Sequence, residues 1–74
     1  MVDEDDRKAR KEMGEKMKSV REKKNLTQAQ VAVEAGIHIN YYARVERGEE
    51  NPTFDILRRI AKGLKSKSSE ILPF

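Results

Sequence analysis

Residues 26–48 of this 74-residue chain have the sequence LTQAQVAVEAGIHINYYARVERG, and this stretch decides the fold. Thr27 is suited to cap a helix, and Gly36 is suited to end it about two and a half turns later. The apolar side chains of that helix share one face: Val31, Ala32 and Ala35. A second short helix is expected from about His38 to Arg47, before Gly48. The stretch therefore predicts two short helices separated by a tight turn that contains glycine.

A longer helix is expected upstream, from about Asp6 to Lys24. Its apolar side chains recur at spacings of three and four on one face: Ala9, Met13, Met17 and Val20. Asn25 is able to adopt the left-handed conformation that ends a helix. The dense charge of the first twelve residues leaves two structures open for them, a helix or a mobile arm. We therefore divide the chain into a charged N-terminal extension, residues 1–12, and one domain, residues 13–74.

A further helix is expected downstream, because Pro52 cannot continue a helix and Thr53 offers a new cap. The side chains expected on its inward face are Phe54, Leu57, Ile60, Ala61 and Leu64. A final single turn, capped by Ser68 or Ser69, is expected before Pro73. Strand patterns are nearly absent from the sequence. The predicted fold is therefore all-α, a compact five-helix domain.

The charged residues are distributed unevenly along the chain. Lys and Arg together number 16 against 13 Asp and Glu, and four of those acids lie in the first six positions. Residues 7–74 therefore carry 16 basic side chains against nine acidic ones. A surplus of this size favours a polyanion such as nucleic acid as the partner.

The composition argues against several other classes of function. No cysteine is present and His38 is the only histidine, so we expect no metal site. The sequence has no paired carboxylates, no Ser/His/Asp set and no Gly-rich phosphate loop, so we expect neither an enzyme nor a cofactor. No apolar run approaches the roughly 20 residues that a membrane helix needs, and the first residues are acidic where a secretory leader is basic and then apolar. We therefore expect a cytoplasmic protein without a membrane partner.

The two short helices suggest how such a protein would contact DNA. In a helix-turn-helix, one helix crosses the DNA backbone while the next lies in the major groove. Ile37, Tyr42 and Val45 supply the apolar face of the second short helix, which leaves its other side chains outward: His38, Ile39, Asn40, Tyr41, Ala43, Arg44 and Arg47. Among these, Asn40 can pair with adenine, Arg44 can make a bidentate contact with guanine, and Ile39 can pack on a thymine methyl group.

Other residues are candidates for the DNA backbone. Gln28 lies at the start of the first short helix, where free backbone N–H groups favour a phosphate. Tyr41 could reach a phosphate or lie flat on the domain surface, and Arg47 is an outward cation near the end of the second short helix. Glu49 and Glu50 follow in the next loop, where two acids would repel DNA unless they point away from it.

The sequence resembles the Cro/phage-repressor (XRE) helix-turn-helix family over about residues 13–72. The residues that carry the resemblance are Leu26, Thr27, Gln28, Val31, Ala32, Ala35, Gly36, Ile37, Tyr42, Val45, Glu46, Arg47, Gly48, Asn51, Pro52, Thr53, Leu57, Ile60 and Ala61. The resemblance implies a lambda-repressor-like DNA-binding domain in which Ile39, Asn40 and Arg44 contact bases and Gln28 holds a phosphate. It also implies a structural ion pair between Arg21 and Glu46. The chain is similar in length to the controller proteins of restriction-modification systems, which act as dimers without a domain for a small-molecule ligand.

These observations lead to one expected function and one alternative. We expect a sequence-specific transcriptional regulator that binds double-stranded DNA as a homodimer on an inverted-repeat operator. The expected dimer interface is apolar and lies at the end of the chain: Ile71, Leu72 and Phe74. The basic residues near the start could form an arm that reaches DNA or a solvated tail: Arg7, Lys8, Arg10 and Lys11. The alternative is a protein-binding adaptor or antitoxin-like module on the same scaffold, which Glu49, Glu50 and the acidic N-terminus favour.

Overall fold

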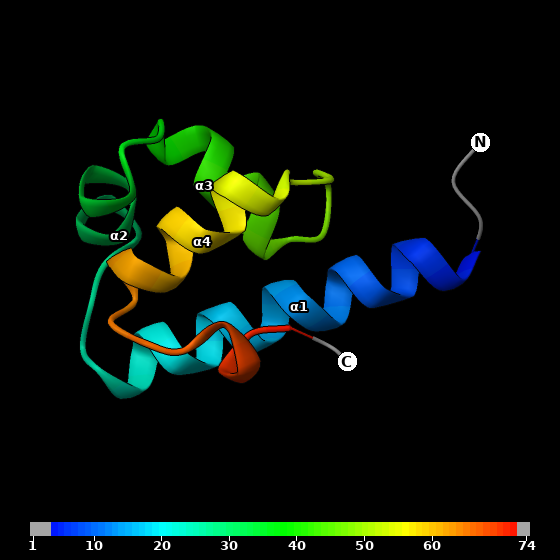
Figure 1. Cartoon of the computed structure of the whole chain (residues 1–74), viewed down its shortest axis with the longest axis horizontal. Coiled ribbons are helices and arrows are strands. Elements are labelled where there is room, and N and C mark those ends of the chain that lie inside the picture. The colour runs from blue at the N-terminus through cyan, green and yellow to red at the C-terminus, as the bar shows by residue number, and fades with distance from the viewer. Residues whose placement is uncertain (1–3, 73–74) are drawn as a thin grey trace.

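The computed structural model describes residues 4–72 of the chain, and all of its regular structure is helical. Four α-helices are followed by one short 3₁₀ turn: α1 (Glu4–Lys23), α2 (Gln28–Ala35), α3 (Ile39–Glu46), α4 (Phe54–Gly63) and η1 (Ser68–Glu70) (Figure 1). The prediction of an all-α domain with a helix-turn-helix at its centre is confirmed. Within the described residues, no helix has the length and apolar character required to cross a bilayer.

Side-chain and backbone caps set the limits of α2 as the sequence predicts. Asn25 has a φ of 57°, in the left-handed region, and turns the chain away from the end of α1. Thr27 Oγ1 then accepts a hydrogen bond of 3.0 Å from the backbone N–H of Gln30, and Gln30 Oε1 accepts one of 2.8 Å from the N–H of Thr27. Gly36, with a φ of 70°, ends the helix. These reciprocal bonds satisfy N–H groups that the first turn of a helix leaves free.

The later helices begin at caps of different kinds. His38 Nδ1 accepts a 3.0 Å hydrogen bond from the N–H of Asn40 and so starts α3, while Thr53 Oγ1 accepts one of 3.2 Å from Ile56 and starts α4. The expectation that Ser68 or Ser69 caps the last turn is wrong, because the turn already begins at Ser68 and Lys67 precedes it. The carboxylate of Glu70 accepts a hydrogen bond of 3.0 Å from the backbone N–H of Lys67 at the start of this turn.

One apolar core holds the helices together. Its buried members are Met13, Met17, Val31, Ala32, Ala35, Tyr42, Val45, Ile60, Ala61, Leu64 and Ile71. The inward faces predicted for the helices supply most of them. Phe54 is the exception, because its side chain is 81% exposed although the helical spacing placed it inward. It is the first residue of α4, and the buried residues of that helix lie in its second half: Ile60, Ala61 and Gly63.

Two glycines allow the helices to approach closely. α2 packs against α4, and α1 packs against α3. A Cβ atom on Gly14 of α1 would lie 2.1 Å from the backbone oxygen of Glu46, at the end of α3. A Cβ atom on Gly63 of α4 would lie 2.8 Å from the backbone oxygen of Val31 in α2. Both helix pairs therefore depend on a position without a side chain.

The charged segment before residue 13 is helical where the structure describes it. α1 starts at Glu4 and continues without a break past residue 12, and its first turns project beyond the other helices (Figure 1). Gly48, with a φ of 77°, lies against this part of α1, since a Cβ atom there would be 2.8 Å from Cα of Lys11. Of the two structures left open for the extension, residues 4–12 adopt the helix.

Replacing Gly14 by alanine is expected to destabilise the domain. Alanine normally stabilises a helix by about 1 kcal/mol relative to glycine. At this position the added methyl group collides with the backbone of α3, so the free energy of unfolding should fall by about 1–3 kcal/mol. Urea denaturation followed by circular dichroism measures it. Ser19→Ala, at an exposed position of α1, is the control and should be neutral or slightly stabilising. A Gly14→Ala protein as stable as the wild type would contradict the close contact.

Candidate nucleic-acid interface

Helix α3 has one buried face and one face open to solvent. Tyr42, Val45 and Glu46 are buried, so they attach the helix to the domain. The residues expected to contact DNA lie elsewhere on α3: Ile39 and Asn40 are exposed, and Tyr41 and Arg44 are half-buried. The division of α3 into inward and outward residues thus follows the pattern that the sequence predicts.

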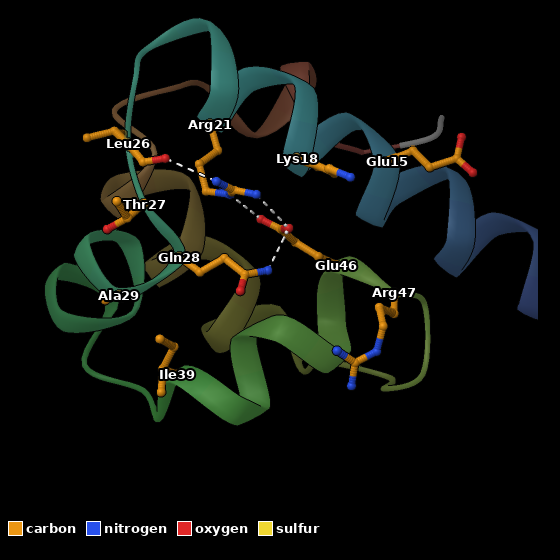
Figure 2. A pocket seen from close by; sticks show the side chains of 10 residues that line it. All are labelled: Glu15, Lys18, Arg21, Leu26, Thr27, Gln28, Ala29, Ile39, Glu46 and Arg47. Atoms are coloured by element: carbon orange, nitrogen blue, oxygen red, sulfur yellow. Dashed lines mark hydrogen bonds and ion pairs between the residues drawn. The ribbon is translucent and has the colours of Figure 1, made fainter.

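A groove lies beside α3 and is formed by three helices. It has a volume of about 780 Å³, and Figure 2 shows the side chains that line it. Lys18 comes from α1, Gln28 from the first turn of α2 and Ile39 from the start of α3, and Arg47 follows the last residue of α3. The groove therefore brings the cations Lys18 and Arg47 together with the acid Glu15 and with the N-terminus of α2, which carries the positive end of a helix dipole.

The inner wall of this groove contains a network centred on Glu46. Arg21 Nε donates to Glu46 Oε2 at 2.7 Å, and Arg21 Nη2 donates to Glu46 Oε1 at 3.2 Å (Figure 2). Arg21 Nη1 also donates to the backbone oxygen of Leu26 at 3.1 Å. Gln28 Nε2 donates to Glu46 Oε1 at 3.0 Å. One carboxylate thus connects α1, α2 and the last residue of α3, at the two positions where the resemblance implied an ion pair.

The ionisation of this network is set by burial and by its internal hydrogen bonds. The Arg21 and Glu46 side chains are 12% and 4% exposed. Burial raises the pKa of the Glu46 carboxyl, but the hydrogen bonds that it accepts from Arg21 and Gln28 outweigh this effect, and the pKa lies below its usual value. Burial beside this carboxylate raises the pKa of the Tyr42 hydroxyl far above its usual value. At neutral pH the site therefore holds an anion and a cation that neutralise each other.

The two arginines of the α3 region are bound by the two acids of the next loop. Arg44 Nε donates to Glu50 Oε2 at 2.8 Å, and the Arg44 guanidinium lies 5.9 Å from the centre of the Tyr41 ring. Arg47 donates to both carboxylate oxygens of Glu49, from Nε at 2.9 Å and from Nη2 at 3.1 Å. From the sequence we expected these acids to repel DNA unless they point away from it, and neither pair was predicted. Their spacing, two and six residues after their partners, matches no helical spacing that could have indicated contact.

Gln28 and the C-terminal residues make contacts within their own chain that the sequence did not predict. The Gln28 amide faces the groove, but its Nε2 already donates a hydrogen bond to Glu46. Gln28 therefore stabilises the ion pair in addition to its expected contact with a phosphate. Ile71 is fully buried in the core of its own chain, so its contact with a partner subunit stays a prediction. Leu72 is half-buried, and its backbone oxygen accepts a 3.0 Å hydrogen bond from Lys16 Nζ. Phe74 lies outside the described residues.

An apolar hollow that the sequence analysis missed lies on the α4–η1 side of the molecule. It has a volume of about 620 Å³, and its apolar lining comes from Phe54, Leu57, Ala61, Ile71 and Leu72. Phe54 stands at its rim with most of its surface exposed. An apolar pattern along a helix cannot distinguish a residue that packs inward from one that packs on a neighbouring molecule, so the spacing alone could not have found this surface.

The fold and the exposed face of α3 define a helix-turn-helix domain, and comparison with known proteins agrees. A helix-turn-helix family model matches residues 17–71. The chain is 32% identical to the control protein C.BamHI of Bacillus amyloliquefaciens over 62 residues. These residues cover 82% of this chain and 76% of C.BamHI. It is 37% identical to the control protein C.SmaI of Serratia marcescens over 60 residues, and these cover 81% of this chain and 71% of C.SmaI.

Two further similarities support the same assignment. The immunity repressor protein of Bacillus phage phi105 is 33% identical over 60 residues, which cover 81% of this chain and 42% of the repressor. The crystal structure of the restriction-modification controller protein C.AhdI from Aeromonas hydrophila superposes with a TM-score of 0.80 at 26% identity, and covers 84% of this chain and 94% of C.AhdI. The chain therefore belongs to the XRE-type helix-turn-helix family of DNA-binding transcription regulators, and it is not an enzyme.

Removing the charge of Glu46 is expected to cost stability in a pH-dependent way. Glu46→Gln leaves Arg21 charged and unpaired, so the free energy of unfolding at pH 7 should fall by about 3–5 kcal/mol. Because the folded pKa of Glu46 is lowered, its contribution is present above the unfolded value of about 4.3 and is lost as the pH falls through the folded value. The difference between the two proteins should therefore shrink on acidification.

Urea denaturation at a series of pH values measures this difference. Glu49→Gln is the matched control, because Glu49 also pairs with an arginine but its side chain is 52% exposed. That variant should unfold nearly as the wild type does. Equal effects of the two substitutions would show that the Arg21–Glu46 pair does not support the fold.

Proposed function

We propose that this regulator binds an inverted-repeat operator in a sequence-specific manner, as a homodimer with one α3 in each of two major grooves. The observation that carries the proposal is the position of Ile39, Asn40 and Arg44 on the open face of a helix whose other face is buried. An amide, a guanidinium and an apolar group can distinguish adenine, guanine and thymine in the major groove. Because Glu46 attaches the end of α3 to α1, these groups are held on a rigid support.

The groove beside α3 supports a set of contacts to the DNA backbone. Lys18 on α1 and Arg47 after α3 are exposed basic side chains that line it, and Gln28 lies at the α2 N-terminus. Tyr41 is half-buried on α3, with its ring near Arg44. Contacts of this kind position a protein on DNA without distinguishing sequences, and they release counterions. Binding should therefore weaken steeply as salt is raised.

The proposed dimer uses the Phe54 face, which we define as Phe54, Leu57 and Leu72 around the apolar hollow. A two-fold interface places the same patch of both subunits in contact, so the Phe54 side chain of each subunit would enter the hollow of the other. Asp55 pairs with both Arg58 (3.2 Å) and Arg59 (3.1 Å) and so reduces like-charge repulsion beside this face. Of the residues expected at the interface, Leu72 stays in it, and Ile71 supports the hollow from the core.

The comparisons favour a controller-type role over that of a larger repressor. C.BamHI, C.SmaI and C.AhdI are each covered over most of their length, whereas less than half of the phage repressor is covered. We therefore take the control proteins as the better guide, and propose that the chain regulates transcription by operator binding alone, without a cofactor or small-molecule ligand.

Selection from a pool of randomised DNA duplexes at near-physiological salt tests the proposal. The wild type should enrich an inverted repeat with half-sites about 10–11 base pairs apart, which places two α3 helices about 34 Å apart. Arg44→Ala should relax the preference at one base pair of each half-site, because a bidentate contact contributes about 1–3 kcal/mol of discrimination. Arg47→Ala is the control and should weaken binding to all sequences alike. No enrichment by the folded wild-type protein would reject the proposal and favour the protein-binding adaptor.

The dimer surface has its own test. Phe54→Ala should weaken self-association by about 2 kcal/mol or more, because a buried aromatic anchor dominates small interfaces. Sedimentation equilibrium of the purified protein measures the dimer dissociation constant. Val33→Ala is the matched control, since Val33 is 78% exposed on α2, away from the Phe54 face. If both variants associate like the wild type, the Phe54 face is not the interface.

A further inference from the structure

The loop after α3 is held in one conformation that brings its acids back along the helix. Gly48, at a φ of 77°, reverses the chain, and the N–H of Glu49 donates to the backbone oxygen of Arg44 at 2.9 Å. This is a Schellman closure of a helix end. Pro52 is buried a few residues later and anchors the other end of the loop. The backbone conformation of the loop therefore places Glu50 next to Arg44.

The two loop acids engage their arginines differently. Glu49 accepts hydrogen bonds from both Nε and Nη2 of Arg47, so one whole edge of that guanidinium is occupied. Glu50 accepts a hydrogen bond only from Nε of Arg44. Within residues 4–72, the Nη1 and Nη2 groups of Arg44 make no other hydrogen bond, and these are the donors that form a fork on guanine O6 and N7.

The Arg44 pair is also the more sheltered of the two. The Arg44 and Glu50 side chains are 42% and 33% exposed, against 57% and 52% for Arg47 and Glu49. The Tyr41 ring lies near the Arg44 guanidinium as a further support. An arginine held at Nε beside an aromatic ring has fewer rotamers open to it before DNA arrives, so less entropy is lost when it contacts a base.

We propose that Glu50 is a specificity-determining residue of the DNA interface, which holds Arg44 by Nε so that its two terminal amino groups form a fixed fork for one guanine. Glu50 is a positioning residue, because it acts through Arg44. Its negative charge also makes Arg44 a poorer ligand for phosphate, so the pair lowers affinity for DNA in general while it favours the correct base. This inference rests on the proposed function, since it concerns the same face of α3.

The experiment compares Glu50→Ala with Glu49→Ala, which removes the same charge one residue earlier in the same loop. Affinity is measured by fluorescence anisotropy for the selected operator and for the same duplex with the Arg44-dependent base pair replaced. Both variants should bind all duplexes more tightly, because an acid is removed. Glu50→Ala should in addition lose about tenfold of the discrimination between the two duplexes, whereas Glu49→Ala should retain it within twofold. Glu50→Gln, whose amide oxygen can still accept from Nε, should recover part of the lost discrimination.

Two further measurements separate positioning from other effects. In an Arg44→Ala background, Glu50→Ala should no longer change the discrimination ratio. Urea denaturation should show that Glu50→Ala and Glu49→Ala are similarly stable. If Glu50→Ala tightens binding to both duplexes equally and keeps the ratio, Glu50 only repels phosphate and the inference is overturned. If the wild-type protein selects no sequence, the proposed function fails and the inference about Glu50 fails with it. If the wild type selects an operator but Glu50→Ala keeps the ratio, only the inference fails, so the two outcomes are distinguishable.

Discussion

The bidentate contact between Arg21 and Glu46 is the constraint on which the DNA-binding surface depends. Glu46 is the last residue of α3, and its carboxylate is held by α1 through Arg21 and by α2 through Gln28. The burial of both side chains makes the pair costly to separate. Together with the buried Tyr42 and Val45, this carboxylate fixes the orientation of α3, and with it the positions of Ile39 and Asn40. The stability of the domain and the placement of the residues proposed to contact DNA therefore share one interaction.

The charge of the α3 surface differs from that of the chain as a whole. The sequence has a clear basic surplus after its acidic start, yet both arginines of the α3 region are neutralised by acids of the following loop. Exposed pairs of this kind contribute little to stability, so their presence on this face is better explained by what they do to binding. In the proposed complex they would reduce attraction to any phosphate, so that base contacts account for more of the affinity.

Much of the architecture follows from local features that the sequence displays. Asn25, Thr27, Gly36 and Thr53 end or begin helices where their side-chain chemistry and backbone preferences predict. Contacts that depend on the folded path of the chain were not foreseen. Ile71 was assigned to a subunit interface because it lies near the chain end, but the return of the chain past α1 and α4 buries it.

The sequence by itself determined the helical class, the approximate limits of the α-helices, the family and the open face of α3, because caps, periodicity and residue chemistry act over a few neighbouring residues. Only the tertiary structure decided which of those side chains are already engaged. The Schellman closure at Gly48 turns Glu50 onto Arg44, and the packing of α4 leaves Phe54 outside the core. Both results depend on the path of the backbone through space, and a one-dimensional pattern of apolar and charged residues does not contain that path.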